Sequence, residues 1–121
     1  MKFVYFLLMV LAVAIAEVKY QVKLENFNAD DVVADKATLL SYLQCLIDEK
    51  PCVGNAAALQ KNARDVVETG CTKCTDDQKH FVKVFLESSA KDLPEAYERF
   101  KKFFDPKGDL LPALAKATAN Y

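Results

Sequence analysis

Residues 45–74 read CLIDEKPCVGNAAALQKNARDVVETGCTKC and hold all four cysteines of the 121-residue chain. The cysteines form two close pairs, Cys45-x6-Cys52 and Cys71-x2-Cys74, with eighteen residues between the pairs. Four cysteines allow three disulfide pairings, and the sequence alone does not choose among them. Short separations favour the neighbours, because bonded Cα atoms must lie within about 4.4–6.8 Å of each other, which a turn provides. Two local bridges would each hold the junction of two helices.

The rest of the chain predicts helices, from capping residues and from apolar positions at helical spacing. Residues 75–78, TDDQ, match a capping box, and Gly70 stands where a C′ glycine belongs. No alternating strand pattern is present, so we expect an all-α fold around a common interior. After an extended arm over residues 17–26, six helices are expected: one beginning at Asn28, then 35–49 and 54–69, one from Thr75, one from near Asp92, and 109–118.

Residues 1–16, MKFVYFLLMVLAVAIA, have the pattern of a secretory signal peptide, with Lys2 before an apolar run and small residues at its end. An uncleaved membrane anchor is the alternative, but the run is too short to span a bilayer. We therefore expect a signal peptide over 1–16 and one secreted, extracellular domain over 17–121, with no stable membrane insertion.

The charge balance limits the partners of that domain. Without residues 1–16 the chain keeps fifteen basic and seventeen acidic side chains, a net charge of −2 with its single histidine neutral. This balance argues against nucleic acid, whose binding needs a basic surplus to neutralise phosphates. Secretion would place the cysteines in an oxidising compartment, which favours disulfides over free thiols.

No catalytic or metal site is expected. The CTKC run at residues 71–74 has the spacing of a redox motif but lacks the βαβ context, so a structural bridge is favoured. The x6 spacing of the first pair is wider than usual for zinc ligands. His80 is the only histidine and is expected to be a solvated helix residue. An esterase-like enzyme is disfavoured because no nucleophile–base arrangement is present, and no cofactor is implied.

The inward faces of the helices leave two interpretations open. By composition they form either a filled core, as in a structural or developmental signalling protein, or the lining of a ligand cavity. The amphipathic spacing predicts which residues point inward, but it does not distinguish a filled interior from a hollow one.

The four-cysteine spacing resembles that of the insect chemosensory protein family, and the likeness covers essentially all of residues 17–121. Further matching features are Leu39-Leu40 and Tyr42 before Cys45, Gln78 just after Cys74, and the DPKG turn at residues 105–108. The resemblance implies local bridges Cys45–Cys52 and Cys71–Cys74, and six helices around an apolar channel. It also implies a non-enzymatic carrier of fatty acids, long-chain alcohols, esters and similar semiochemicals, and we expect this carrier to be a monomer.

The resemblance also implies ligand contacts for Tyr42 and Gln78. Tyr97 stands at a position that is often tryptophan in that family, and Leu110 and Leu114 stand where aromatic residues are common. These departures leave the expected fold unchanged and bear on the shape of the pocket. Together with the inward helix faces, the expected ligand-binding residues are Leu39, Tyr42, Leu43, Leu46, Val66, Gln78, Phe81, Val82, Phe85, Tyr97, Phe100, Leu110 and Leu114.

Overall fold

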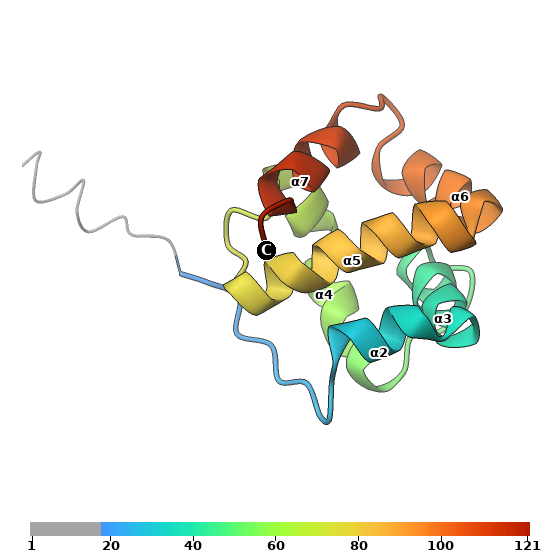
Figure 1. The fold of residues 1–121 in the computed structure, drawn as a ribbon, viewed down its shortest axis with the longest axis horizontal. Helices are drawn as coiled ribbons and strands as arrows, with labels where there is room; N and C mark the ends of the chain where they lie inside the picture. Colours follow the sequence, from blue (N-terminus) through green and yellow to red (C-terminus); the bar gives the residue numbers. More distant parts are fainter. Residues whose placement is uncertain (1–17) are drawn as a thin grey trace, which may run out of the picture.

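A computed structural model describes residues 18–121, and these residues form six α-helices and no β-strand. The predicted signal peptide lies outside the described residues. The all-α fold predicted from the sequence is therefore confirmed for this part of the chain. The helices are α2 (Ala29–Ala34), α3 (Lys36–Leu46), α4 (Gly54–Thr69), α5 (Asp76–Asp92), α6 (Pro94–Phe104) and α7 (Leu110–Thr118) (Figure 1).

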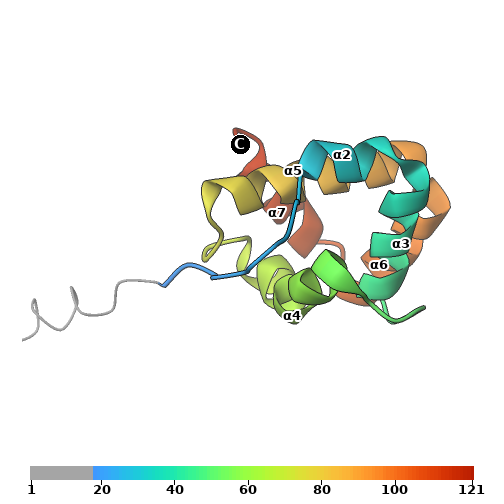
Figure 2. The ribbon, with the colours of Figure 1, turned by 90° about the horizontal axis from the view of Figure 1, so that it is seen from below.

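Helix α5 runs through the middle of the molecule, with α6 and α7 on one side and α2 and α3 on the other (Figure 1). It packs against all four of these helices. Helix α4 packs instead against α3 and α7, and it lies across the molecule from α2 and α5 (Figure 2). Helices α4 and α5 thus follow each other in sequence but lie on opposite sides of the interior.

Three helix ends form where local chemistry predicts them. The side chain of Asn28 accepts hydrogen bonds from the backbone nitrogens of Asp30 (2.9 Å) and Asp31 (3.2 Å) at the start of α2. Thr75 and Gln78 form the predicted capping box at the start of α5. Gly70 ends α4 in the left-handed conformation, with φ of 66°, which costs glycine little because it has no Cβ. These contacts satisfy backbone groups that a helix end leaves without partners.

Helix α3 ends at Leu46, three residues before the predicted end at Glu49. Asp48 has a φ of 62°, so it cannot continue a right-handed helix. The chain instead closes a turn, in which the backbone nitrogen of Glu49 donates to the oxygen of Gln44 at 2.8 Å. This turn brings Cys52 back to Cys45.

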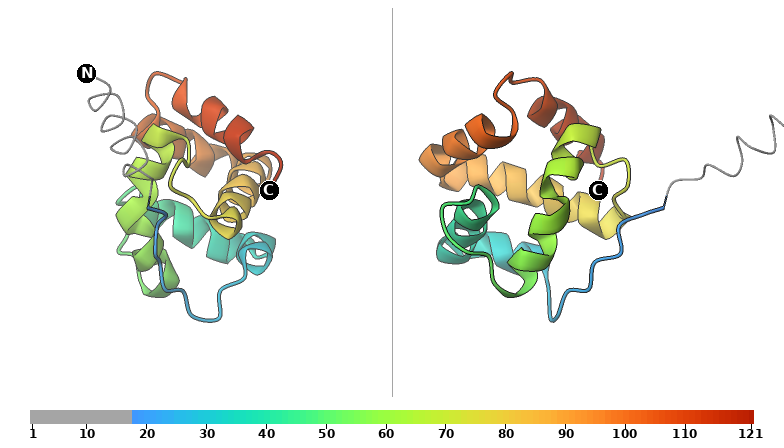
Figure 3. Two further views of the ribbon diagram at one scale, coloured as in Figure 1. Left: turned by 90° about the vertical axis from the view of Figure 1, so that its left-hand side faces the viewer. Right: turned by 180° about the vertical axis from the view of Figure 1, so that it is seen from behind.

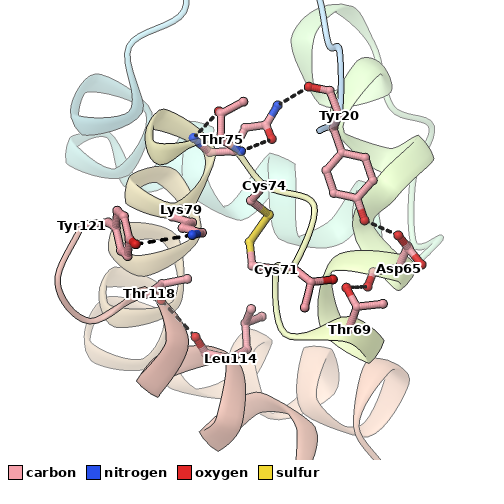
Figure 4. Close-up of a disulfide and its surroundings, with 12 residues drawn as sticks. Tyr20, Asp65, Thr69, Cys71, Cys74, Thr75, Lys79, Leu114, Thr118 and Tyr121 are labelled. Carbon is pink, nitrogen blue, oxygen red and sulfur yellow. Dashed lines mark hydrogen bonds between the residues drawn. A yellow bond between two sulfur atoms is a disulfide. The ribbon is translucent and has the colours of Figure 1, made fainter. Parts of the chain in front are cut away.

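Both predicted disulfides are present and local. The Cα atoms of Cys45 and Cys52 are 4.9 Å apart, and those of Cys71 and Cys74 are 5.0 Å apart. The first bridge closes the corner between α3 and α4, and the second closes the corner between α4 and α5 (Figure 4). The described residues contain no free cysteine. On the chain-entropy model each bridge stabilises the fold by about 2 kcal/mol, because the loops that they close are short.

A row of aromatic rings runs through the interior from the N-terminal arm to α6. The ring centroids are 5.1 Å apart for Phe27 and Phe81, 5.5 Å for Phe81 and Phe85, and 5.8 Å for Phe85 and Phe100. Phe104 continues the row at 4.8 Å from Phe100. Edge-on and tilted contacts at these distances are favourable beyond the area that they bury.

Two further findings concern functions that the fold could support. Within residues 18–121 no helix combines the length and the hydropathy needed to cross a membrane. The same residues also bring together no group of three or more side chains suited to hold a metal ion.

Candidate functional site

A cavity with a volume of about 650 Å³ lies between α4 and α5. This size is within the range of about 300–1,000 Å³ that is typical of small-molecule sites. Helices α3, α6 and α7 contribute one residue each to the wall, namely Leu46, Phe100 and Leu114. Most of the wall is therefore built by α4, by α5 and by the N-terminal arm, residues 20–28.

Helix α4 contributes one continuous face. Leu59, Ala63, Val66 and Val67 recur at three- and four-residue intervals, which places them along one side of a helix. Only Val67 of these is fully buried, and the other three remain partly accessible. An apolar face that is not covered by another helix is what leaves room for a ligand here.

Helix α5 faces α4 across the cavity with Phe81, Val82, Phe85 and Leu86. Two of these residues belong to the aromatic row, so the cavity has rigid rings on the α5 side. Aliphatic side chains line it on the α4 side. A wall of this composition suits a long hydrocarbon chain, whose burial is favourable by about 0.8 kcal/mol for each methylene.

The N-terminal arm forms the third side of the cavity. Residues 20–28 run from the corner between α4 and α5 towards α2 (Figure 3), and Tyr20, Val22, Leu24 and Phe27 line the cavity along this path. The arm has no helix or strand of its own between residues 18 and 28. Its position therefore depends on contacts with the rest of the molecule.

Tyr20 holds the first end of the arm. Its backbone nitrogen donates to the oxygen of Lys73 at 2.9 Å, and its phenol donates to the carboxylate of Asp65 (Figure 4). Burial, together with the hydrogen bond to Asp65, raises the pKa of Tyr20 to about 12. The phenol therefore stays protonated at neutral pH and remains a donor to α4.

Gln78 joins the arm to the start of α5. Its side-chain oxygen accepts from the backbone nitrogen of Thr75 at 2.9 Å, and its side-chain nitrogen donates to the backbone oxygen of Tyr20 at 3.3 Å. These two bonds fix the orientation of the amide at the cavity wall. The predicted ligand residue Gln78 is thus also part of the structure that holds the arm.

His80 bridges three segments at the edge of the cavity. Its Nε2 lies 3.1 Å from the carboxylate of Asp30 in α2, and its Nδ1 lies 3.1 Å from the backbone oxygen of Tyr121. The interaction with the Tyr121 backbone and then that with Asp30 raise the pKa of the imidazole. The expectation of a merely solvated histidine was incomplete, since the ring is partly buried and pairs with oxygens on both sides.

Eight of the thirteen predicted ligand-binding residues lie on the cavity wall. They are Leu46, Val66, Gln78, Phe81, Val82, Phe85, Phe100 and Leu114. They come from five helices that are separate in the sequence, and the fold brings them around one space.

The other five predicted residues lie away from this wall. Leu39 and Leu43 have no exposed surface and fill the core, and Tyr42 and Leu110 pack at its edge. Tyr97 stacks on Phe100 with ring centroids 6.0 Å apart, so it supports a wall residue from outside the cavity. Helical periodicity identified all five as inward-facing, but it could not tell the core from the cavity.

Two of the parts of the wall that sequence reasoning did not identify bear on ligand binding. The first is the arm, which has no periodic pattern that would have signalled a role. The second is Asn62, a polar residue within the apolar face of α4. Its position three residues after Leu59 and four before Val66 was a signal in the sequence, since that spacing places it on the inward face.

Comparison with known proteins agrees with this architecture. The model of the insect pheromone-binding family A10/OS-D matches residues 20–111. Protein A10 of Drosophila melanogaster is 30% identical over 92 residues, which cover 76% of this chain and 59% of A10. Ejaculatory bulb-specific protein 3 of the same species is 26% identical over 96 residues, covering 79% of this chain and 76% of that protein.

Two solved structures share the fold. A chemosensory protein in complex with bromo-dodecanol has a TM-score of 0.66 and 26% identity, covering 75% of this chain and 91% of that one. The antennal chemosensory protein A6 of Mamestra brassicae has a TM-score of 0.62 and 28% identity, covering 78% and 97%. The family match extends over most of the described residues and includes both disulfides. The chain belongs to the A10/OS-D family of insect chemosensory proteins, a family of non-enzymatic binding proteins.

Proposed function

We propose that this chain is a secreted carrier that binds a small, long-chain hydrophobic molecule in the cavity between α4 and α5 and keeps it in solution. The observation that carries the proposal is the apolar cavity of about 650 Å³ itself. A relative of the same fold was solved in complex with bromo-dodecanol, a molecule of this class. The eight predicted residues on the wall are the proposed ligand contacts.

The energetics favour micromolar binding. Burying twelve to sixteen methylenes gains about 10–13 kcal/mol, and association costs at least about 4 kcal/mol in lost freedom. The remaining 6–9 kcal/mol, a rough figure, corresponds to Kd values from tens of micromolar for twelve carbons to below micromolar for sixteen. A carrier with such affinities can load and unload its ligand without a covalent step.

Secretion is supported by two separate features. Both pairs of cysteines form disulfides, which persist in oxidising compartments. The amino-acid sequence of residues 1–16 has the composition of a signal peptide. The alternative of a filled structural bundle is not favoured, because a molecule without a ligand has no need to leave an apolar volume of this size uncovered.

The test is displacement of a fluorescent apolar probe by straight-chain alcohols of eight to eighteen carbons. We expect Kd values that tighten as the chain lengthens from eight carbons, reach the micromolar range between twelve and sixteen carbons, and level off once the chain fills the cavity. Native mass spectrometry of protein purified from its source should show a bound lipid-sized mass. Failure of every alcohol to displace the probe would overturn the carrier function.

A further inference from the structure

Among the partly buried polar side chains that line the cavity, one makes no hydrogen bond to another part of the described chain. Asn62 lies on the wall, partly buried, between the apolar residues Leu59 and Val66. Among residues 18–121 its amide group has no hydrogen-bonding partner, whereas Asn28 and Gln78 on the same wall cap α2 and α5. A partly buried amide without a partner gains from any ligand group that supplies one.

The neighbouring polar groups are already occupied. The phenol of Tyr20 donates to Asp65, and both nitrogens of His80 face oxygens of other residues. Their hydrogen-bonding capacity serves the fold and is not free for a ligand. Gln21 also lines the cavity but is exposed, so Asn62 is the one partly buried amide on the described wall that is available to a ligand.

The charges on the wall are acidic. Asp30 and Asp77 both contribute to it, at the first turns of α2 and α5, and residues 18–121 place neither lysine nor arginine there. The one ionisable nitrogen group, His80, is already paired with Asp30 at 3.1 Å. Asp30 and Asp77 are exposed, but a carboxylate entering this cavity would lose its hydration and find no lysine or arginine to pair with, and a buried charge without a partner is costly.

We propose that Asn62 binds the head group of the ligand, and that the cavity selects linear molecules with a neutral head over carboxylates of the same length. This inference rests on the proposed carrier function. An amide has both donors and an acceptor, so it pairs with the hydroxyl of a primary alcohol and can donate to the oxygen of an aldehyde or an ester. The chemical class assigned to the site is therefore the long-chain alcohol, aldehyde or ester.

The first experiment compares 1-dodecanol with dodecanoate in the probe-displacement assay at pH 8.0, where the acid is ionised. We expect 1-dodecanol to bind at least about fivefold more tightly, because the carboxylate loses its hydration without a basic partner and lies near the acidic side chain of Asp77. Asp77→Asn should narrow this difference by strengthening dodecanoate binding. Equal binding of both ligands to the unmodified protein would overturn the selectivity.

The second experiment replaces the amide. Asn62→Leu, which keeps the branched shape and the number of side-chain heavy atoms, should weaken 1-dodecanol binding about three- to tenfold, as expected for one lost hydrogen bond, and leave n-dodecane binding unchanged or tighter. Asn62→Ala gives the same comparison if the leucine variant fails to fold, and Asn120→Leu on the exposed C-terminal segment is the matched control.

These outcomes separate the two proposals. If 1-dodecanol binds but Asn62→Leu leaves its affinity unchanged, the head-group assignment is wrong while the carrier function stands. If no alcohol binds the unmodified protein, the carrier function itself is wrong.

Discussion

The side-chain amide of Asn55 forms two hydrogen bonds with the backbone of Glu25. Its oxygen accepts from the nitrogen of Glu25 at 3.0 Å, and its nitrogen donates to the oxygen of Glu25 at 2.9 Å. Asn55 lies in the first turn of α4, so this pair holds the second end of the arm, as Tyr20 holds the first. The arm is thus fixed at both ends to α4, and the stretch between them walls the cavity.

Asn55→Ala should loosen the arm. Removing two exposed hydrogen bonds should cost about 1–2 kcal/mol of stability and should speed dissociation of a bound probe. Stopped-flow fluorescence measures the dissociation rate, and urea unfolding measures the stability. The matched control is Asn120→Ala, which removes an exposed asparagine far from the arm. A dissociation rate equal to that of the unmodified protein would mean that the arm does not limit release.

His80 should contribute to stability in a pH-dependent way. A neutral imidazole has one N–H and can donate to only one of its two oxygen partners, Asp30 or Tyr121, whereas an imidazolium donates to both. The pKa of His80 is raised in the folded state, with nearby Lys83 opposing this effect. The contribution is therefore fully present below the unfolded-state pKa of about 6.5 and is lost as the pH rises through the higher folded-state value.

The measurement is the difference in melting temperature between the unmodified protein and His80→Gln. We expect the histidine protein to have its largest advantage at pH 6.0 and a smaller one at pH 8.5. A difference in melting temperature of the same size at both pH values would show that protonation of His80 does not strengthen its contacts with Asp30 and Tyr121.

Asp105 should stabilise the start of α7. Its buried carboxylate accepts from the backbone nitrogens of Gly108 (3.0 Å), Asp109 (3.2 Å) and Leu111 (2.9 Å). Desolvation acts to raise the pKa of this carboxyl, but the backbone donors outweigh it and hold the pKa below its usual value. Stability from this group is therefore present above about pH 3.9 and is lost as the pH falls through the lower folded-state value.

Asp105→Asn places an NH2 group against a backbone donor, so we expect a melting temperature about 5–10 °C lower at pH 7. This decrease in melting temperature should become smaller below pH 4. The control is Asp109→Asn, which changes an exposed neighbour and should leave the melting temperature almost unchanged. Thermal melts monitored by circular dichroism test this, and an unchanged melting temperature for Asp105→Asn would contradict it.

Much of this fold could be predicted from the sequence because its signals are local. The capping box at Thr75, the glycine at position 70 and the spacing of the cysteines each act within a few residues, and all three occur as expected. The end of α3 was predicted too late, because the left-handed backbone of Asp48 depends on closing the disulfide turn. Local chemistry does not contain that constraint.

The candidate site could be predicted only in part. Leu39 and Leu46 both face inward on α3, yet the first is sealed in the core and the second borders the cavity. Whether an inward residue is sealed in the core or borders the cavity depends on which helix packs against it. A periodic pattern of apolar residues does not contain this information. The arm was expected to be extended, but its role as a wall follows from anchors at Tyr20 and Glu25 that lie far from their partners in the sequence.

The most direct test of the account is to fill the cavity and measure ligand binding. Ala63 lies on the wall contributed by α4, so Ala63→Phe should occupy space that the ligand needs, while Ala90→Phe adds the same ring on an exposed face of α5. In probe displacement with 1-dodecanol we predict a Kd of roughly tens of micromolar for the unmodified protein and for Ala90→Phe, and at least about tenfold weaker binding for a folded Ala63→Phe. Equal affinity in all three proteins would contradict the claim that this cavity holds the ligand.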